Sequence, residues 1–405
     1  MSPYEDIRVE GHLIDSGIMS AIMDAVVELE GEFETLSFDV GRTNNDVSIA
    51  LLRIKAPSEE RLDEILHIIQ EHGAVPVDPS DADLAPAPAD GVLPDRFYST
   101  TNLQTWIRIG GKWVAVQGVE MDLGVCVDLA TGTARSVPMA EVRAGDICVV
   151  GHKGLRIKPQ ERPRDRQAFE FMNSAVSSEK PKAQVVAEVA RLLRETRKAG
   201  KGTIVVAGPA VVHTGAASHL ARLVRLGYVD VLFGGNAVAV HDIESSLFGT
   251  SLGVSMTEGT PTLGGHEHHL RAINTIRSCG SIAAAVEQGV LTSGLMHTLV
   301  DTGTPFVLAG SIRDDGPLPD VITDVIEAQN TMRTYCRTAG TCLMLSTMLH
   351  SIATGNMLPA DTATVCIDIN PAVVTKLADR GSWQTIGIVT DVGLFVEQLA
   401  NDLEG

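Results

Sequence analysis

The sequence predicts an α/β protein of three modules: a βαββαβ module at residues 1–80, a small β module at residues 95–160, and a domain built on a parallel sheet at residues 180–405. Three observations lead to this prediction. Strands and helices alternate near the N-terminus, alternating apolar residues flank a glycine pair in the middle, and continuous apolar runs separated by helical stretches fill the second half. A chain of 405 residues is long enough for two or three such units.

The first module is predicted from the order of its elements. Strand-like stretches cover residues 8–14, 35–40, 47–54 and 74–78, and helical stretches cover residues 19–31 and 59–72. In the second helical stretch Leu62, Ile65, Leu66 and Ile69 share one face, which is typical of an amphipathic helix. The order β-α-β-β-α-β predicts a ferredoxin-like module.

The next segment, residues 78–94, is rich in Pro, Ala and Asp, and we expect an exposed linker there. Residues 105–116 alternate apolar and polar positions around Gly110-Gly111, which predicts a hairpin. Further strand-like stretches follow to about residue 158, so this part should form a small β module.

The third region opens with a predicted helix from about Lys182 to Lys198. Six apolar runs then follow, separated by helical stretches: TIVVAG, DVLFGGN, PFVLAGS, CLMLST, TVCIDI and IGIVTD. Continuous rather than alternating apolar residues indicate parallel strands buried on both faces. Such sheets bind ligands at the carboxyl ends of their strands, where Gly208, Gly215 and Gly234-Gly235 fall. Their spacing departs from G-x-G-x-x-G, so this stretch favours a nucleotide fold without establishing a standard dinucleotide site.

Composition narrows the class of protein. Hydrophobic content of 44% and charged content of 20% are those of a globular protein, and no apolar run is long enough to span a membrane. A formal net charge of −19 argues against a nucleic-acid partner, because phosphate backbones attract a basic face. The six cysteines lack a C-x-x-C pair, which favours reduced, buried thiols. With no signal peptide evident at Met1, we expect a cytoplasmic location.

Polar residues follow several of the predicted parallel strands. They are Asn236, Asp314, Asp315, His350, Asp368 and Asp391. Because these strands all end at one edge of the sheet, the set predicts a ligand site there. Asp368, between an apolar strand and Pro371, suits a carboxylate that accepts both hydroxyls of a ribose. The alternative for each acid is a helix cap or a turn.

The stretch GGHEHHLRAINTIR, residues 264–277, concentrates histidines at a predicted helix start. His266 and His269 would share a helix face, but no H-E-x-x-H motif is present, so we expect no metal. Arg271 and Arg277 follow, and an arginine fork suits a substrate carboxylate. A surface ion pair is the equally weighted alternative. No G-x-S-x-G or Walker motif supports a hydrolase or a kinase.

Long stretches of the sequence resemble one family. Among them are EMDLGVCVD, FEFMNSAVSSEKP, GYVDVLFGGNAVAVHDIE, GGHEHHLRAINTIR, FVLAGSIRDDGPLPDVITDV and DINPAVVTKLADRGS. The chain resembles the archaeal-type NAD-dependent ornithine cyclodeaminases, whose conserved region is also described as related to lysine-ketoglutarate reductase/saccharopine dehydrogenase. The resemblance implies conversion of L-ornithine to L-proline and ammonia, with NAD as a recycled hydride acceptor. It also implies a Rossmann-like C-terminal domain similar to that of deoxyhypusine synthase.

The resemblance implies a set of site residues. The cofactor contacts would be Asn236, Ala237, Asp315, Thr347, Met348, Leu349, His350, Asp368, Asp391 and Val392. For ornithine, Arg277 could hold the carboxylate, Asp315 an amine or the nicotinamide ribose, and His266 could relay protons. We expect a homo-tetramer or homo-dimer. Two alternatives stay open: a transferase of the deoxyhypusine-synthase kind and a non-catalytic NAD-dependent sensor.

Overall fold

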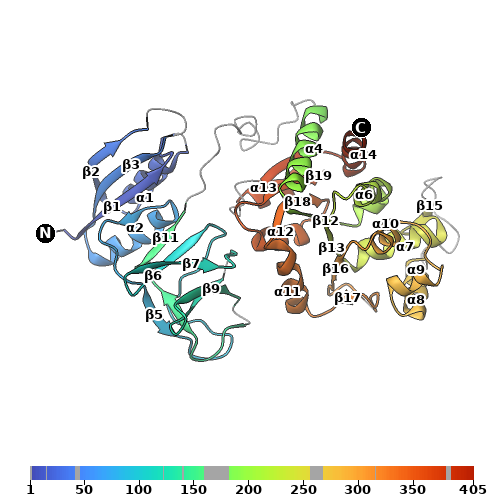
Figure 1. The fold of residues 1–405 in the computed structure, drawn as a ribbon, viewed down its shortest axis with the longest axis horizontal. Helices are drawn as coiled ribbons and strands as arrows, with labels where there is room; N and C mark the ends of the chain where they lie inside the picture. Colours follow the sequence, from blue (N-terminus) through green and yellow to red (C-terminus); the bar gives the residue numbers. More distant parts are fainter. Residues whose placement is uncertain are drawn as a thin grey trace. The chain divides into compact units, whose positions relative to one another are not determined.

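A computed structural model describes residues 2–14, 16–41, 46–121, 123–138, 141–158, 182–255, 268–314, 316–379 and 385–405. The chain divides into two compact units, Met1–Ala168 and Phe169–Gly405. Figure 1 shows each unit by its colours, with the first in blue to green and the second in green to red. Among the described residues, no helix has the length and apolar character needed to cross a membrane.

The first sheet of unit 1 has the ferredoxin-like order β2-β3-β1-β4. Its elements are β1 (Tyr4–Gly11), α1 (Ile18–Glu28), β2 (Glu32–Asp39), β3 (Ser48–Lys55), α2 (Glu59–Glu71) and β4 (Val75–Pro76). The four apolar residues predicted to share a face of α2 are all buried. The first strand begins at Tyr4, earlier than predicted, because it pairs with β3 over its whole length. The ferredoxin-like prediction is confirmed.

The second sheet of unit 1 has the order β11-β6-β7-β9-β8-β10-β5. Its strands are β5 (Asp83–Pro86), β6 (Thr105–Ile109), β7 (Lys112–Gln117), β8 (Gly124–Asp128), β9 (Thr133–Val137), β10 (Ile147–Val150) and β11 (Leu155–Ile157). The predicted hairpin is confirmed: β6 and β7 pair across Gly110 and Gly111, whose φ angles of +56° and +76° suit the tight turn.

The prediction of an exposed linker at residues 78–94 is wrong in part, since β5 lies inside it and pairs with β10. An edge strand forms a ladder on one side only, so it tolerates the Pro and Asp residues that suggested a linker. Gln70 of α2 connects the two sheets of unit 1, donating through Nε2 to the carbonyls of His152 and Leu155. The module boundaries near residues 80 and 95 stay a prediction.

Unit 2 is built on a parallel sheet of order β17-β16-β13-β12-β18-β19-β20. Its strands are β12 (Gly202–Ala207), β13 (Val231–Gly235), β16 (Phe306–Ala309), β17 (Val321–Ile322), β18 (Ala339–Leu345), β19 (Ala363–Asp368) and β20 (Thr385–Val389). All six predicted parallel strands are present, and β17 is an additional short edge strand. The strand order reverses between β12 and β18, as in a Rossmann-like sheet.

Helices cover both faces of this sheet (Figure 1). They are α4 (Lys182–Lys198), α5 (Ala210–His213), α6 (Ala216–Arg225), α7 (Asn236–Phe248), α8 (His268–Cys279), α9 (Ile282–Glu287), α10 (Leu295–Asp301), α11 (Val325–Cys336), α12 (Leu349–Met357), α13 (Pro371–Asp379) and α14 (Val392–Glu404). Val205 packs in a core with α4, α6 and α14, while its neighbours Ile204 and Val206 pack with α11, α12 and α13. Successive side chains of one strand are therefore both buried, which explains the continuous apolar runs. Five of the six cysteines are buried and none is in a disulfide.

Candidate functional site

The strands β12 and β18 approach each other very closely where the strand order reverses. Gly208, just after β12, donates from its backbone N–H to the Leu345 carbonyl at 2.9 Å. A Cβ atom on Gly208 would lie 2.2 Å from the carbonyl oxygen of Ser346, so no other residue fits there. Ser346 itself has a φ of +49°, an unusual conformation for a residue other than glycine. The glycine found in the sequence is thus required by the crossing point of the sheet.

Three helices begin at this edge without a side-chain cap. The caps of α6, α7 and α12 are Gly215, Gly235 and Met348, and none of them accepts a hydrogen bond through a side chain. By contrast, Asp391 caps α14 by accepting from the Leu394 N–H at 2.9 Å. Uncapped helix starts present free N–H groups and the positive end of the helix dipole, which favours an anion such as a pyrophosphate.

Asn236 and Arg277 hold the same loop from two elements. The Asn236 side chain, 8% exposed at the start of α7, accepts through Oδ1 from the Leu318 N–H at 3.0 Å. Arg277 of α8, which is exposed, donates to the carbonyl of Pro317. Both predicted residues therefore lie at the loop that follows β16, with the half-buried Ala237 beside Asn236.

His350 lies on α12, which follows β18 on the other side of the point where the strand order reverses. Its Nε2 atom lies 3.2 Å from the position that a Cβ on Gly235 would occupy, so α12 contacts the end of β13. Burial lowers the pKa of His350, and the nearby Asp314 carboxylate opposes this only in part. The preceding residues of the predicted set are a half-buried Thr347 and the exposed side chains of Met348 and Leu349.

The last residues of the predicted set lie at the carboxyl ends of β19 and β20. Asp368 is 8% exposed and accepts through Oδ1 from the Asn370 N–H at 2.8 Å. Its backbone carbonyl accepts from Thr390, whose buried Oγ1 has no hydrogen-bond partner within the described residues. Val392 is buried, and the helix it begins packs closely enough that a Cβ on Gly393 would lie 2.8 Å from the Thr214 carbonyl. The strand-end residues thus converge on one edge.

His266 and Asp315 lie outside the described residues, so their predicted roles and the pairing of His266 with His269 stay predictions. The described part of this helix begins at His268. Its Nδ1 atom lies 2.8 Å from Thr250 Oγ1, and its ring stacks on Phe248 with centroids 4.9 Å apart. Among the described residues, no cluster of three or more His, Cys, Asp or Glu side chains could hold a metal ion.

Comparisons with known proteins decide the family. Residues 187–399 match the model of the arginine dihydrolase ArgZ-like C-terminal Rossmann fold, residues 104–186 match its first region, and residues 4–103 match the LOR/SDH bifunctional enzyme conserved region. The ornithine cyclodeaminase of Methanothermobacter thermautotrophicus is 51% identical over 98% of this chain and 97% of its own length. The chain belongs to the archaeal-type ornithine cyclodeaminase family.

Two solved structures extend the cyclodeaminase likeness. The apo structure of ArgZ, a cyanobacterial arginine dihydrolase, has a TM-score of 0.86 at 42% identity and covers 99% of this chain. A ternary complex of AgrE with ornithine and NAD+ has a TM-score of 0.54 at 46% identity and again covers 99% of this chain. This chain spans 58% of the ArgZ chain and 57% of the AgrE chain.

Sequence reasoning missed two acids of this cyclodeaminase that are buried on α7. The Asp242 carboxylate accepts from the Leu295 and Met296 N–H groups at 2.9 and 2.7 Å, which caps α10. Burial raises the pKa of Asp242 to about 6, although these two hydrogen bonds lower it. The available signal was the run His241-Asp242-x-Glu244 inside an otherwise apolar helix, since buried charges require partners.

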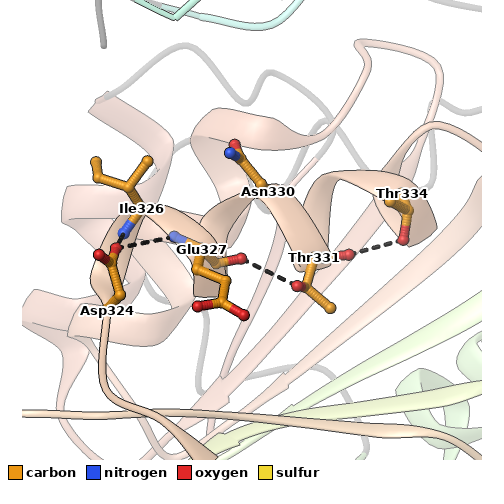
Figure 2. A pocket seen from close by; sticks show the side chains of 6 residues that line it. All are labelled: Asp324, Ile326, Glu327, Asn330, Thr331 and Thr334. Atoms are coloured by element: carbon orange, nitrogen blue, oxygen red, sulfur yellow. Dashed lines mark hydrogen bonds between the residues drawn. The ribbon is translucent and has the colours of Figure 1, made fainter. Parts of the chain in front are cut away.

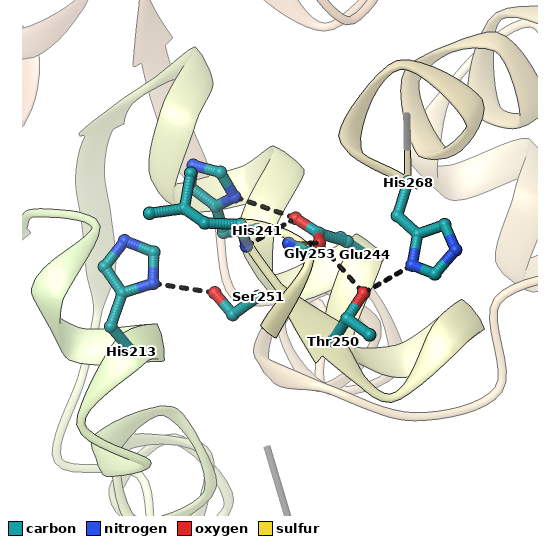
Figure 3. Close-up of polar contacts among 8 residues, drawn as sticks. His213, His241, Glu244, Thr250, Ser251, Gly253 and His268 are labelled. Carbon is teal, nitrogen blue, oxygen red and sulfur yellow. Dashed lines mark hydrogen bonds and ion pairs between the residues drawn. The ribbon is translucent and has the colours of Figure 1, made fainter. Parts of the chain in front are cut away.

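The second acid, Glu244, is fully buried at the centre of a polar cluster (Figure 3). It accepts four hydrogen bonds, from His241 Nδ1 at 3.0 Å, Thr250 Oγ1 at 2.9 Å, the Leu252 N–H at 3.2 Å and the Gly253 N–H at 2.9 Å. Burial alone would raise the pKa of Glu244, but these bonds bring it below its ordinary value. The carboxylate is therefore ionised although it is buried.

A separate hollow lies along α11 (Figure 2). Its polar groups are already used within the helix: Asp324 caps it by accepting from Ile326 and Glu327, and Thr331 donates to the Glu327 carbonyl. It offers no set of convergent free groups, so it is a poor candidate for the cyclodeaminase site.

Proposed function

We propose that this protein converts L-ornithine to L-proline and ammonia with NAD as a recycled hydride acceptor. The observation that carries the proposal is the complex of AgrE with ornithine and NAD+, because 99% of this protein is covered by the AgrE chain at 46% identity. The relative whose name gives this activity matches over 97% of its own length, so the likeness extends over both units.

The carboxyl edge of unit 2 fits NAD. In our proposal the adenosine ribose binds Asp368, whose Oδ2 atom makes no hydrogen bond to the described part of the chain. Thr390 Oγ1, which also has no partner among the described residues, then hydrogen-bonds to the cofactor. The pyrophosphate lies over the uncapped helix starts near Gly208, and the nicotinamide end lies beside Asn236 and His350. When bound, NAD supplies an acceptor that takes a hydride from the substrate and returns it, so there is no net oxidation.

The substrate site lies next to the nicotinamide end. Within the described residues one guanidinium N–H group of Arg277 donates to Pro317, and in our proposal the others bind the ornithine carboxylate. Asp315 binds an amine or the nicotinamide ribose, and His266 relays protons. These three assignments rest on the sequence pattern and on the position of Arg277 next to residues 316–318.

We also propose a cytoplasmic homo-oligomer, with the tetramer preferred and the dimer second. The reduced, buried thiols suit a reducing compartment. The edge strand β2 exposes Phe33, Leu36 and Phe38, which a neighbouring subunit would cover.

Product analysis tests the function. Purified protein with catalytic NAD and L-ornithine should yield equal amounts of proline and ammonia. A transferase of the deoxyhypusine-synthase kind would need a second amine as acceptor, and a sensor would bind NAD without forming product. Absence of proline under conditions where NAD binding is demonstrated would contradict the proposal.

A further inference from the structure

The polar cluster around Glu244 joins three parts of unit 2 (Figure 3). His241 and Glu244 lie one turn apart on α7, Thr250 and Ser251 form β14, and His268 begins α8. Glu244 is fully buried, with four donors that hold it as an anion. Such a fixed negative charge can orient and polarise a neighbouring imidazole.

His241 is held in one tautomer. Because its Nδ1 atom hydrogen-bonds to the Glu244 carboxylate, which only accepts, Nδ1 carries a proton. The Nε2 atom makes no hydrogen bond to the described part of the chain, and 10% of the side-chain surface stays exposed. In the neutral ring Nε2 is therefore a hydrogen-bond acceptor that has no partner among the described residues.

A second histidine faces this ring. His213 ends α5, and its ring centroid lies 5.0 Å from that of His241 with a tilt of 56°. Its Nδ1 atom lies 2.7 Å from Ser251 Oγ. The pKa of His213 is lowered by partial burial and then by the neighbouring His241, while Glu244 opposes both. Although its ring is partly desolvated, the His213 residue as a whole is exposed at the surface.

The histidine pair lies near the carboxyl edge where the substrate is expected. The helix α7 starts at Asn236, immediately after β13, and His241 follows five residues later, about 7.5 Å along the axis. The short helix α5 that carries His213 starts three residues after the end of β12. Since β12 and β13 are adjacent, the two rings belong to helices that follow neighbouring strands at the carboxyl edge of the sheet.

A structural role accounts for the His241 Nδ1–H group, which is one of the four donors to Glu244, but not for the other ring nitrogen. Thr250 and the N–H groups of Leu252 and Gly253 also hold the carboxylate, and they belong to the hairpin formed by β14 and β15 (Val254–Ser255). The His241 ring next to His213 has a second nitrogen, Nε2, that makes no hydrogen bond to the described residues. Proton transfer gives that nitrogen a use.

We propose that His241, positioned by Glu244, is the acid–base group for the amine of the substrate, with His213 lining the approach. The inference rests on the proposed function. His241 Nε2 takes a proton from the α-ammonium group, which frees the amine lone pair to form a C=N bond; NAD, when bound, would supply the acceptor for the Cα hydride. After the δ-amine bonds to Cα, the original C–N bond breaks and the same proton leaves with ammonia. The δ-nitrogen gives up two protons before the cyclic C=N bond forms. One of them returns to the proline nitrogen after the hydride is delivered, and the other converts the released ammonia to ammonium, so the protons balance.

The test uses H241N, because the asparagine amide can still donate to Glu244 and keep the buried hydrogen bond. We expect kcat to fall at least 100-fold, the typical scale for losing an acid–base group. The affinity for NAD should stay within threefold of the wild-type value, and the Tm should stay within 2 °C of it. In H241A, added imidazole should restore part of kcat, more at high pH where it is a free base. E244Q should lower kcat about tenfold or more with E244D less affected, since Glu244 acts through His241.

The matched control is H297N on α10, outside the cluster, which should retain wild-type kcat. A value of kcat for H241N within threefold of wild type would overturn the inference. A loss confined to KM, or a loss in H241A that imidazole does not relieve, would also overturn it. These outcomes are separate from failure of the proposed function, in which the wild-type protein itself would form no proline.

Discussion

The buried Asp242 predicts a distinctive dependence of stability on pH. Its carboxyl group is 3% exposed, and burial raises its pKa from 3.8 to about 6. The folded protein therefore binds this proton more tightly than the unfolded chain does. Its contribution to stability is complete below pH 3.8 and is lost as the pH rises through 6, the opposite of a carboxylate whose pKa is depressed by an ion pair.

The size of the effect follows from that shift. A shift of about 2 pH units, at about 1.4 kcal/mol each, lowers the free energy of unfolding by about 3 kcal/mol at full ionisation. Between pH 4.5 and pH 7 the change is about 2 kcal/mol. In D242N the side chain is neutral at every pH, so the free energy of unfolding no longer falls between pH 4.5 and pH 7 on account of this residue. At pH 4.5 the variant should be less stable than wild type by about 1 kcal/mol, because a single amide oxygen replaces two carboxyl oxygens as acceptor for Leu295 and Met296.

Thermal unfolding followed by circular dichroism checks this prediction. From pH 4.5 to pH 7, the Tm of D242N relative to wild type should rise by roughly 4–8 °C for a unit of this size. D361N serves as the control, because the Asp361 side chain is 67% exposed and its ion pair within the described residues is with the surface Lys201. If the Tm difference between D242N and wild type were the same at both pH values, the carboxyl would be ionised in the fold without cost, and the reasoning would fail.

Three further predictions concern the site and the assembly. D368N keeps an oxygen for the Asn370 N–H but loses the charge, so NAD should bind about 10- to 100-fold more weakly by calorimetry; unchanged affinity with an intact fold would refute the ribose assignment. R277A should lower kcat/KM for ornithine about tenfold or more, mainly through KM, and a wild-type value would mean that another group holds the carboxylate. Light scattering should report a tetramer or a dimer, and a stable monomer at micromolar concentration would contradict the proposed assembly.

Most elements could be predicted because burial leaves a plain pattern in the sequence. Strands such as β18 and β19 are covered on both faces, so every residue in them is buried and the apolar run is continuous. The strands that the sequence did not predict lie at the edges of sheets. The strands β5 and β17 lie at the margins of their sheets, where short length, Pro and Asp conceal the strand. The polar start of β1 concealed its first residues in the same way.

Some residues of the candidate site could likewise be predicted from the sequence, and others could not. Asn236, His350 and Asp368 could be placed because the ends of parallel strands meet at one edge whatever the helices do. The hydrogen bonds that keep the buried Glu244 ionised could not be placed, because three of the four donors come from the hairpin at residues 250–253. Helical periodicity says that two side chains share a face but not which loop satisfies them.

The most direct test of the central claim follows the hydrogen at the ornithine Cα. L-ornithine carrying deuterium at Cα is incubated with the protein and catalytic NAD, and proline and the cofactor are then analysed by mass spectrometry and absorbance. Because the same hydride leaves the substrate and returns, the account predicts deuterium in the proline product and no accumulation of NADH. Proline without deuterium, or NADH formed in proportion to product, would contradict a cyclodeaminase that recycles its NAD.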